Sequence, residues 1–353
     1  MATIRLLPDG REVDCRDDRP ILETLEAAGH PLPNDCRAGH CGTCRIRLRS
    51  GDVDRGLYMP MALSDEDAAE GYLLSCVATP VTPVVELEYG AAVAAAALGV
   101  ELFAPRTDVE FVVTDKIART PGIVEVRLRP VGRRLKYWPG QYVVLGPRDG
   151  GGLERPYSIA NPPRPDGEIT LHVARVSGGV TSTWVHEHLS LGDPVTVAGP
   201  YGSFVGDLRM RGPVVALAGG SGLAPVLALT EAALRRGYED PVTVLHSART
   251  PDDLYATGLL GHLCRSHPNF RYVRTVTRPD TRVAGTRTGR VPEILRGVTG
   301  SLAEANVFVA GSPGFVAACG AAARALGAGA GRVHVETFFP RSPGGRPPDR
   351  TPS

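Results

Sequence analysis

Four cysteines in the first quarter of the chain could bind a metal: Cys36, Cys41, Cys44 and Cys76. The first three follow a C-x4-C-x2-C spacing and the fourth comes much later, which is an arrangement in which four thiolates hold a [2Fe–2S] cluster. Gly39 and Gly42 lie inside the run, and glycine reaches positive φ without a Cβ penalty. The loop can therefore wrap tightly and point its N–H groups at the sulfurs.

Other thiol chemistries fit this pattern less well. Structural zinc sites usually pair two short C-x2–4-C knuckles, whereas the fourth cysteine stands alone in 73–77, which we predict to be a strand. A redox dithiol at Cys41 and Cys44 leaves Cys36 unexplained. Arg45 stands where a haem attachment site needs histidine. The spacing favours the iron–sulfur cluster, and a zinc-binding interaction module without redox work is the alternative from another class.

Arg155, Tyr157 and Ser158 offer the side-chain types that a bound flavin requires. A cation must meet its pyrophosphate, an aromatic ring must cover the isoalloxazine, and a hydroxyl or N–H must address N5. Arg155 and Tyr157 are two residues apart in a predicted strand and so share a face. Taken alone the string is a weak signal, because a surface arginine and a core tyrosine are the ordinary interpretation.

A glycine pair precedes a short predicted helix over 183–189. Gly178 and Gly179 lead into Thr181 and Ser182, whose hydroxyls lie before this helix. The amino end of a helix with such groups can bind a pyrophosphate. An ordinary helix cap would use the same residues equally well.

A strand, a glycine turn and a helix open the last third of the chain. The apolar run 214–218 leads directly into Gly219, Gly220, Ser221 and Gly222. Helix N–H groups after such a turn can face the phosphates of a dinucleotide. Further βα units follow, with strands expected at 242–246, 272–276 and 307–310. This alternation predicts a doubly wound parallel sheet, and Gly219 and Gly311 each end a strand, where such sheets bind nucleotides.

The elements before this sheet read as two smaller units. The first is a mixed sheet with a helix from Pro20 to Gly29, a short helix capped by Ser64, and strands at 2–7, 11–15, 45–49, 73–77 and 84–88. The second is an antiparallel barrel with strands at 109–113, 124–128, 142–145, 170–176 and 194–197. We expect domains over 1–90, 106–212 and 213–339, an Ala-rich linker over 91–105 and a disordered tail over 340–353.

Three parts of the sequence resemble known families. The loop 35–44 and the segment 72–76 are similar to those of the β-grasp ferredoxin domain, over residues 2–90. The segment 107–211 is similar to the flavin domain of the ferredoxin–NADP reductase superfamily. In this order, and with the nucleotide domain, residues 2–339 resemble the NADH-dependent reductase components of multicomponent oxygenases. Those serve Rieske-type aromatic-ring dioxygenases and di-iron hydrocarbon monooxygenases in aromatic hydrocarbon catabolism.

The resemblance implies a β-grasp ferredoxin domain, a six-stranded antiparallel barrel that binds FAD, and a doubly wound α/β domain that binds NADH. It implies cluster ligation by Cys36, Cys41, Cys44 and Cys76. It implies FAD contacts from Arg155, Tyr157, Ser158, His172, Gly179, Thr181, Ser182 and either Phe338 or Phe339, of which we select Phe339. It implies NADH contacts from Gly219, Gly220, Gly222, Arg249 and Gly311. Hydride transfer to flavin N5 would involve Ser158 and Gly311.

The implied function is electron transfer from NADH through FAD and the cluster to a separate oxygenase protein. An alternative is the same cofactor chain serving another acceptor, such as a deoxysugar-forming dehydratase. Asp252 and Asp253 favour NADH, whereas Arg249 or Arg278 could meet the 2′-phosphate of NADPH. One departure stands out, because many family members have Cys-Gly-Pro-Pro where this chain has a segment that starts at Ala310.

Composition excludes several other classes. Hydrophobic residues make up 42% and charged residues 22%, and no apolar run has the length of a membrane span. Residues 1–90 carry 16 acidic and 9 basic residues, a net charge of −7, which suits steering toward a basic protein partner. There is no basic stripe for nucleic acid, no Rieske motif and no Glu-x-x-His pair. Seven cysteines suit a reducing compartment, so we expect a cytoplasmic protein. We also expect a monomer.

Overall fold

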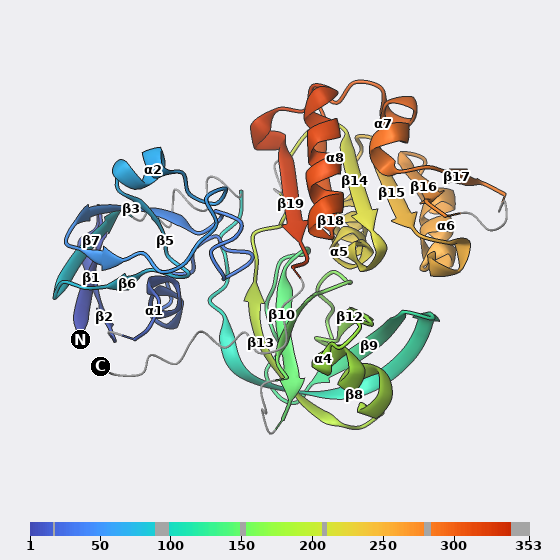
Figure 1. Ribbon diagram of the computed structural model, residues 1–353. Helices are drawn as coiled ribbons and strands as arrows, with labels where there is room; N and C mark the ends of the chain where they lie inside the picture. The colour runs from blue at the N-terminus through green and yellow to red at the C-terminus, as the bar shows by residue number, and fades with distance from the viewer. Residues whose placement is uncertain (17, 89–98, 149–152, 207–209, 279–283, 340–353) are drawn as a thin grey trace. The chain divides into compact units, whose positions relative to one another are not determined.

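A computed structural model describes residues 1–16, 18–88, 99–148, 153–206, 210–278 and 284–339 (Figure 1). One compact unit comprises Met1–Asp108 with Leu135–Val143 and Ala198–Met210, and the rest of the chain forms a second unit. Part of the predicted linker 91–105 and all of the predicted tail 340–353 lie outside the described residues.

The N-terminal residues fold into a five-stranded sheet with the order β2-β1-β7-β3-β5. Its strands are β1 (Ala2–Leu7), β2 (Arg11–Cys15), β3 (Arg45–Ser50), β5 (Tyr72–Leu74) and β7 (Val84–Glu88). A two-stranded sheet joins β4 (Val53–Asp54) to β6 (Thr79–Pro80). β1 pairs parallel with β7 and antiparallel with β2, so the strands predicted at 2–7 and 11–15 are present and form a hairpin.

Two helices accompany this sheet. In α1 (Ile21–Ala27), Ile21, Leu22 and Leu25 are fully buried in the same core as Ile4 of β1. The short helix α2 (Asp65–Ala69) begins where Ser64 Oγ accepts a hydrogen bond from the Asp67 N–H, as the sequence predicted. The apolar face of α1 therefore packs against the sheet, and the cysteine loop leads into strand β3 of that sheet.

The predicted strand over 73–77 is wrong in its second half, because β5 ends at Leu74. The register pairs Leu74 with Arg45, the first residue of β3, so the ladder ends there. The chain then turns, and the N–H groups of Val77 and Ala78 both bond to the Leu74 carbonyl, at 3.1 and 3.0 Å. Cys76 consequently lies in a turn rather than in a strand.

The middle of the chain forms a six-stranded sheet with the order β11-β10-β13-β8-β9-β12. These strands are β8 (Arg106–Thr120), β9 (Ile123–Pro130), β10 (Tyr142–Pro147), β11 (Arg155–Ser158), β12 (Ile169–Ala174) and β13 (Pro194–Tyr201). An antiparallel bridge between Ile159 and Leu171 joins the end of β11 to β12. This bridge links the two edges of the sheet and closes it into the expected barrel.

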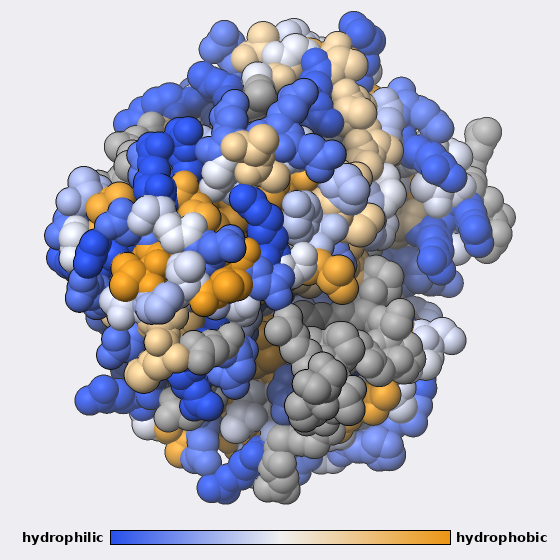
Figure 2. All heavy atoms as spheres, turned by 60° about the vertical axis from the view of Figure 1, so that its left-hand side comes forward, coloured by the Kyte–Doolittle hydropathy of each residue, from blue (hydrophilic) through white to orange (hydrophobic). Residues whose placement is uncertain are grey.

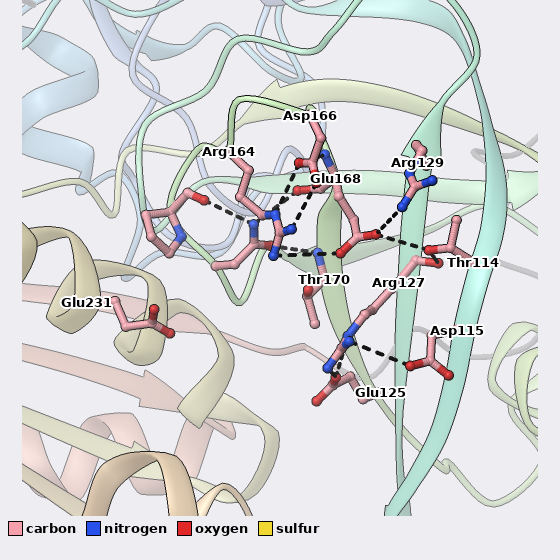
Figure 3. A network of polar contacts seen from close by, with 12 residues as sticks. Thr114, Asp115, Glu125, Arg127, Arg129, Arg164, Asp166, Glu168, Thr170 and Glu231 are labelled. Carbon is pink, nitrogen blue, oxygen red and sulfur yellow. Dashed lines mark hydrogen bonds and ion pairs between the residues drawn. The ribbon is translucent and has the colours of Figure 1, made fainter. Parts of the chain in front are cut away.

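Polar side chains connect two barrel strands, β8 and β9, to the loop before β12 (Figure 3). Glu168 is buried, and its Oε2 accepts a hydrogen bond from Thr114 Oγ1 at 3.2 Å. Arg129 and Arg164 approach the same carboxylate at 3.5 and 3.8 Å. β8, β9 and the loop before β12 are thus held by one buried anion with several partners, which is the condition for burying a charge at tolerable cost.

The glycine-led helix predicted over 183–189 starts earlier than expected. A helical turn, α4 (Val180–Thr183), follows Gly179 directly, because the Thr183 N–H bonds to the Gly179 carbonyl at 3.0 Å. The turn continues as a π-helical segment, η1 (Trp184–His188).

The last part of the chain forms a six-stranded parallel sheet with the order β17-β16-β15-β14-β18-β19 (Figure 1). Its strands are β14 (Val214–Gly219), β15 (Val242–Ala248), β16 (Phe270–Val276), β17 (Thr286–Thr288), β18 (Asn306–Gly311) and β19 (Val333–Thr337). Neither β17 nor β19 was predicted from the sequence. The chain runs outward from β14 to β17 and then returns to β18 beside β14, as in a doubly wound sheet.

Four helices connect these strands: α5 (Leu223–Arg235), α6 (Thr257–Ser266), α7 (Val291–Thr299) and α8 (Pro313–Ala325). Three single 3₁₀ turns also lie among the described residues of this α/β part: η2 (Gly220–Gly222), η3 (Pro251–Asp253) and η4 (Ala330–Arg332). Leu295 of α7 and Cys319 of α8 share one core with Val215, Leu217 and Val309 of the sheet. These two helices therefore cover the face of the sheet to which those alternate strand residues point.

Among the described residues, no helix is long and apolar enough to cross a membrane. On the face drawn in Figure 2, apolar side chains form small groups among hydrophilic ones.

Candidate functional site

The cysteine loop depends on its two glycines. Gly39 has φ +74° and Gly42 has φ +78°, which is the left-handed region that favours glycine. A Cβ on Gly39 would stand 2.7 Å from the Leu57 carbonyl oxygen, and one on Gly42 would stand 2.7 Å from that of Ala62. Both the turn and the close approach of segment 57–62 thus require glycine, as the sequence indicated.

The backbone of this loop donates hydrogen bonds to sulfur. The N–H groups of Ala38 and His40 point to Cys36 Sγ, at 3.5 and 3.2 Å. The backbone N–H of Gly39 addresses the Cys76 thiol. Oriented N–H groups of this kind stabilise negative charge on sulfur, so the loop is suited to thiolates.

The four thiols approach one another as two pairs. Hydrogen bonding with Cys41 lowers the pKa of the Cys36 thiol, and hydrogen bonding with Cys76 lowers that of Cys44. The same interactions raise the pKa values of Cys41 and Cys76. The Cys44–Cys76 pair forms because both the N–H and the hydroxyl of Ser75 bond to the Cys44 carbonyl, at 3.2 and 2.9 Å.

Two pairs of thiols fit a cluster with two irons, each held by two cysteines. A zinc ion would instead need its ligands gathered around one point. The donor set therefore fits the [2Fe–2S] group better than zinc.

Strand β11 carries the residues that were expected to contact a flavin, and they lie on its two faces. Arg155 and Tyr157 alternate with Pro156 and Ser158 along the strand, so the first two share a face, as predicted. Burial raises the pKa of Tyr157 to about 12, so its phenol stays protonated. Arg155 Nη1 donates to the Glu154 carbonyl at 2.7 Å. A cation and an aromatic ring thus stand side by side on one face of a barrel strand.

The hydroxyl of Ser158 meets a residue that the sequence analysis missed. Ser158 Oγ donates to Glu336 Oε1 at 2.9 Å, and both residues are buried. Glu336 belongs to β19, a strand that was not predicted, so only the fold brings it to β11. Val333 and Val335 alternate with His334 and Glu336, and this period of two could have indicated the strand.

Three residues near α4 use their side chains or backbone locally. Ser182 Oγ accepts from the Val176 N–H at 3.1 Å and donates to the Gly179 carbonyl at 3.1 Å. A Cβ on Gly179 would stand 2.7 Å from Ser182 Oγ. Thr181 Oγ1 donates to the Leu153 carbonyl. The two hydroxyls shape the turn, and their predicted contact with a pyrophosphate stays a prediction.

His172 lies on β12, on the strand face opposite to that of Leu171 and Val173, with 3% of its side chain exposed. Its Nδ1 is 3.1 Å from the Tyr255 hydroxyl, and its Nε2 is 3.6 Å from Glu125 Oε2. Burial lowers the pKa of His172, because the charged imidazolium loses water. The ring therefore links the barrel to the segment after β15, and its contact with FAD stays a prediction.

The glycine turn after β14 meets the end of β18. A Cβ on Gly222 would stand 2.1 Å from the Ala310 carbonyl oxygen and 2.9 Å from Gly311 N. Gly311 itself has φ +152°, and a Cβ there would stand 3.4 Å from Gly219 Cα. The two loops thus meet where the strand order reverses, which is where doubly wound sheets bind nucleotides.

The segment after β19 returns to this place. The Phe338 N–H donates to the Gly311 carbonyl at 2.8 Å, and 37% of Phe339 is exposed. Either ring could cover a flavin, so the choice of Phe339 stays a prediction.

The residues expected to read the nucleotide ribose follow β15. Arg249 and Asp252 are exposed, whereas Asp253 is committed to its own turn. Its Oδ2 accepts from the N–H and the hydroxyl of Thr250, at 3.1 and 2.9 Å. Asp252 is therefore the carboxylate better placed to meet a ribose hydroxyl.

Three family models match successive parts of the chain. Residues 4–81 match the 2Fe-2S iron-sulfur cluster binding domain, 109–205 the oxidoreductase FAD-binding domain and 216–320 the oxidoreductase NAD-binding domain. Terephthalate 1,2-dioxygenase reductase component 2 from Comamonas sp. is 31% identical over 327 residues, which cover 92% of this chain and 93% of that protein. The chain belongs to the reductase components of oxygenase systems.

Two further relatives lie close to this reductase. The reductase subunit of an aromatic O-demethylase from Amycolatopsis sp. is 35% identical over 283 residues, which cover 78% of this chain and 81% of the relative. The crystal structure of the Amycolatopsis cytochrome P450 reductase GcoB superposes with a TM-score of 0.84 at 31% identity, covering 96% of this chain and 99% of that one. The reductase is thus an oxidoreductase that combines FAD, a [2Fe–2S] cluster and NADH, and its fold class is confirmed.

Proposed function

We propose that this reductase delivers electrons from NADH, one at a time, to a separate oxygenase protein. The observation that carries the proposal is the set of paired thiols, flavin barrel and nucleotide sheet within one chain of a family named for oxygenase systems. When bound, the flavin accepts a hydride and the cluster carries single electrons.

The chain's own residues would bind and orient these groups. Cys36 and Cys41 would hold one iron, and Cys44 and Cys76 the other, with N–H donors stabilising the charge on sulfur. Arg155 would neutralise phosphate and Tyr157 would cover the flavin ring, because the two share a face of β11.

The nucleotide end would work through close backbone approach. Gly219, Gly220 and Gly222 leave the turn after β14 open to a pyrophosphate, and Gly311 would lie beside the nicotinamide. Ser158 would orient the flavin edge while its hydroxyl stays fixed by Glu336. Ala310 carries a methyl group in place of a thiol, so it supplies no sulfur to the nicotinamide.

The acceptor would be a terminal oxygenase that acts on an aromatic compound. Relatives are named for terephthalate 1,2-dioxygenase, phenol 2-monooxygenase and an aromatic O-demethylase. The likeness to the cytochrome P450 reductase GcoB favours a P450 acceptor alongside the Rieske and di-iron classes. We further propose that the protein is cytoplasmic, because cysteines that form no disulfide suit a reducing compartment, and that it is a monomer.

The test is an anaerobic absorption spectrum of the purified protein, titrated with NADH. We expect flavin bands and iron–sulfur absorption, both bleaching as NADH is added. A protein that holds flavin together with zinc, and no iron, would overturn the assignment of the cysteine loop.

A further inference from the structure

Asp35, the residue before Cys36, accepts three hydrogen bonds through its side chain. Thr43 Oγ1 donates to Oδ2 at 2.7 Å, within the cysteine loop itself. Both donors to Oδ1 come from a distant residue, since the N–H and the hydroxyl of Ser203 each reach it at 2.9 Å. Ser203 lies two residues after the end of β13, so this carboxylate joins the cysteine loop to the segment that follows a barrel strand.

A second contact joins the same residue to another barrel strand. The Tyr142 hydroxyl donates to the main-chain carbonyl of Asp35 at 2.7 Å, and Tyr142 is the first residue of β10. Gly202 permits this packing, because it has φ +95° and a Cβ there would stand 2.9 Å from the Tyr142 ring. Gln141, just before β10, donates to the carbonyl of Gly202, just after β13, at 3.1 Å, and this bond connects the two strands at that end.

Arg37, on the other side of Cys36, contacts the same strands. Its guanidinium lies 4.5 Å from the ring centre of Tyr201, the last residue of β13. Glu26 holds that guanidinium with both oxygens, at 2.7 and 2.8 Å. A bidentate pair fixes the orientation of the plane, so Arg37 can lie flat on the aromatic ring.

We propose that Asp35 is a positioning residue: through Ser203 and Tyr142 it fixes the cysteine loop to β10 and β13, so that electrons pass between the flavin and the cluster at a constant separation. The cysteine loop does not need these bonds to bind iron, because its sulfurs already receive N–H groups from the loop. A carboxylate beside a ligand with two donors from another domain instead serves to hold geometry. The inference rests on the proposed function.

The test removes two of the three hydrogen bonds that Ser203 and Tyr142 donate to Asp35, and it leaves the cysteine loop unchanged. The bond from the Ser203 N–H remains in the variant. The variant is Tyr142→Phe with Ser203→Ala, and the matched control is Tyr238→Phe with Ser301→Ala. Tyr238 also donates its hydroxyl to a backbone carbonyl, that of Gly212, and Ser301 is exposed. Both double variants lose one phenol and one serine hydroxyl, and only the first touches Asp35.

Two readouts are compared in the cofactor-loaded protein. Amide hydrogen exchange of the peptide over 34–44 should rise about tenfold or more in the variant and stay unchanged in the control, because the lost hydrogen bonds resist local opening. In stopped flow, flavin bleaching by NADH should keep its rate while the later bleaching of the cluster becomes slower. A protein with Tyr142 intact and Ser203→Thr, which keeps the hydroxyl, should show wild-type amide exchange and a wild-type rate of cluster bleaching.

Several results would overturn the proposal. Unchanged exchange would mean that these bonds do not hold the loop. Faster exchange with an unchanged cluster phase would reduce Asp35 to a purely structural role. A wild-type protein whose flavin bleaches with NADH while the cluster does not would contradict the proposed function itself, which is a different failure and is visible without any variant.

Discussion

Ser158 and Glu336 lie 178 residues apart in the chain, yet their side chains share a hydrogen bond of 2.9 Å. The bond joins β11 of the flavin barrel to β19 of the nucleotide sheet, close in sequence to Phe338, whose N–H bonds to Gly311. One buried contact thus links the expected flavin side and the expected nicotinamide side.

Replacing Ser158 by Ala should slow the reduction of the flavin by NADH. One hydrogen bond is worth about 1 kcal/mol, so we expect a loss on the order of fivefold in the rate constant measured by stopped flow. Glu336→Gln should have a smaller effect, because an amide oxygen can still accept. An unchanged rate for Ser158→Ala, measured beside the exposed control Ser301→Ala, would remove Ser158 from this role.

Replacing Cys76 by Ser should abolish the iron–sulfur absorption and leave the flavin bands. One of the four thiolates is lost, and the Cys44 pair is broken. Iron and acid-labile sulfide, measured together, should fall from about two of each per chain to near zero. Cys264→Ser is the control, since Cys264 lies on α6, and it should keep the full iron content. A full cluster in the Cys76 variant would assign the fourth ligand elsewhere.

Replacing Gly222 by Ala should weaken NADH binding. The new Cβ would stand 2.1 Å from the Ala310 carbonyl, so the two loops must separate at a cost of about 1–3 kcal/mol. The dissociation constant for NADH, measured by isothermal titration calorimetry on the flavin-free protein, should rise about tenfold or more. Gly314→Ala is the matched change, because a Cβ at Gly314 meets nothing within 4 Å. Equal affinities in the two variants would contradict the placement of the nucleotide.

The protein should prefer NADH to NADPH. Exposed Asp252 follows β15, and a carboxylate there would accept from a ribose hydroxyl and repel a 2′-phosphate. We expect kcat/KM to be on the order of tenfold higher for NADH, with the ratio reduced in Asp252→Asn. A preference for NADPH would instead assign Arg249 to the 2′-phosphate.

His246 should make folding stability fall at acid pH. Burial lowers the pKa of His246 to about 4, below its ordinary value of 6.5. Between these values the unfolded chain binds the extra proton, so the free energy of unfolding rises with pH across this window and falls as acid is added, by about 3 kcal/mol in total. In urea unfolding at a series of pH values, His246→Gln should lose less stability between pH 6.5 and 4. Parallel curves for the two proteins would show that His246 does not titrate in the unfolding equilibrium.

Local patterns in the sequence were sufficient for much of this protein. The cysteine spacing, Gly39, Gly42 and the glycine turn after β14 were readable because the chemistry needs those residues at short, fixed separations. The period of the apolar residues likewise predicted the mixed sheet, the barrel and the parallel sheet, because strands and helices repeat their buried positions every two or about 3.6 residues. The family resemblance then joined these parts into a reductase.

Only the tertiary structure decided which distant residues meet. Cys76 was expected in a strand, but the β3 register ends the ladder at Leu74 and places the thiol in a turn. The bond of Asp35 to Ser203 spans 168 residues and that of Ser158 to Glu336 spans 178. Such contacts depend on sheet register and on where a crossover returns the chain. No pattern within a short stretch of sequence contains that information, because each strand is compatible with many partners until the whole sheet has formed.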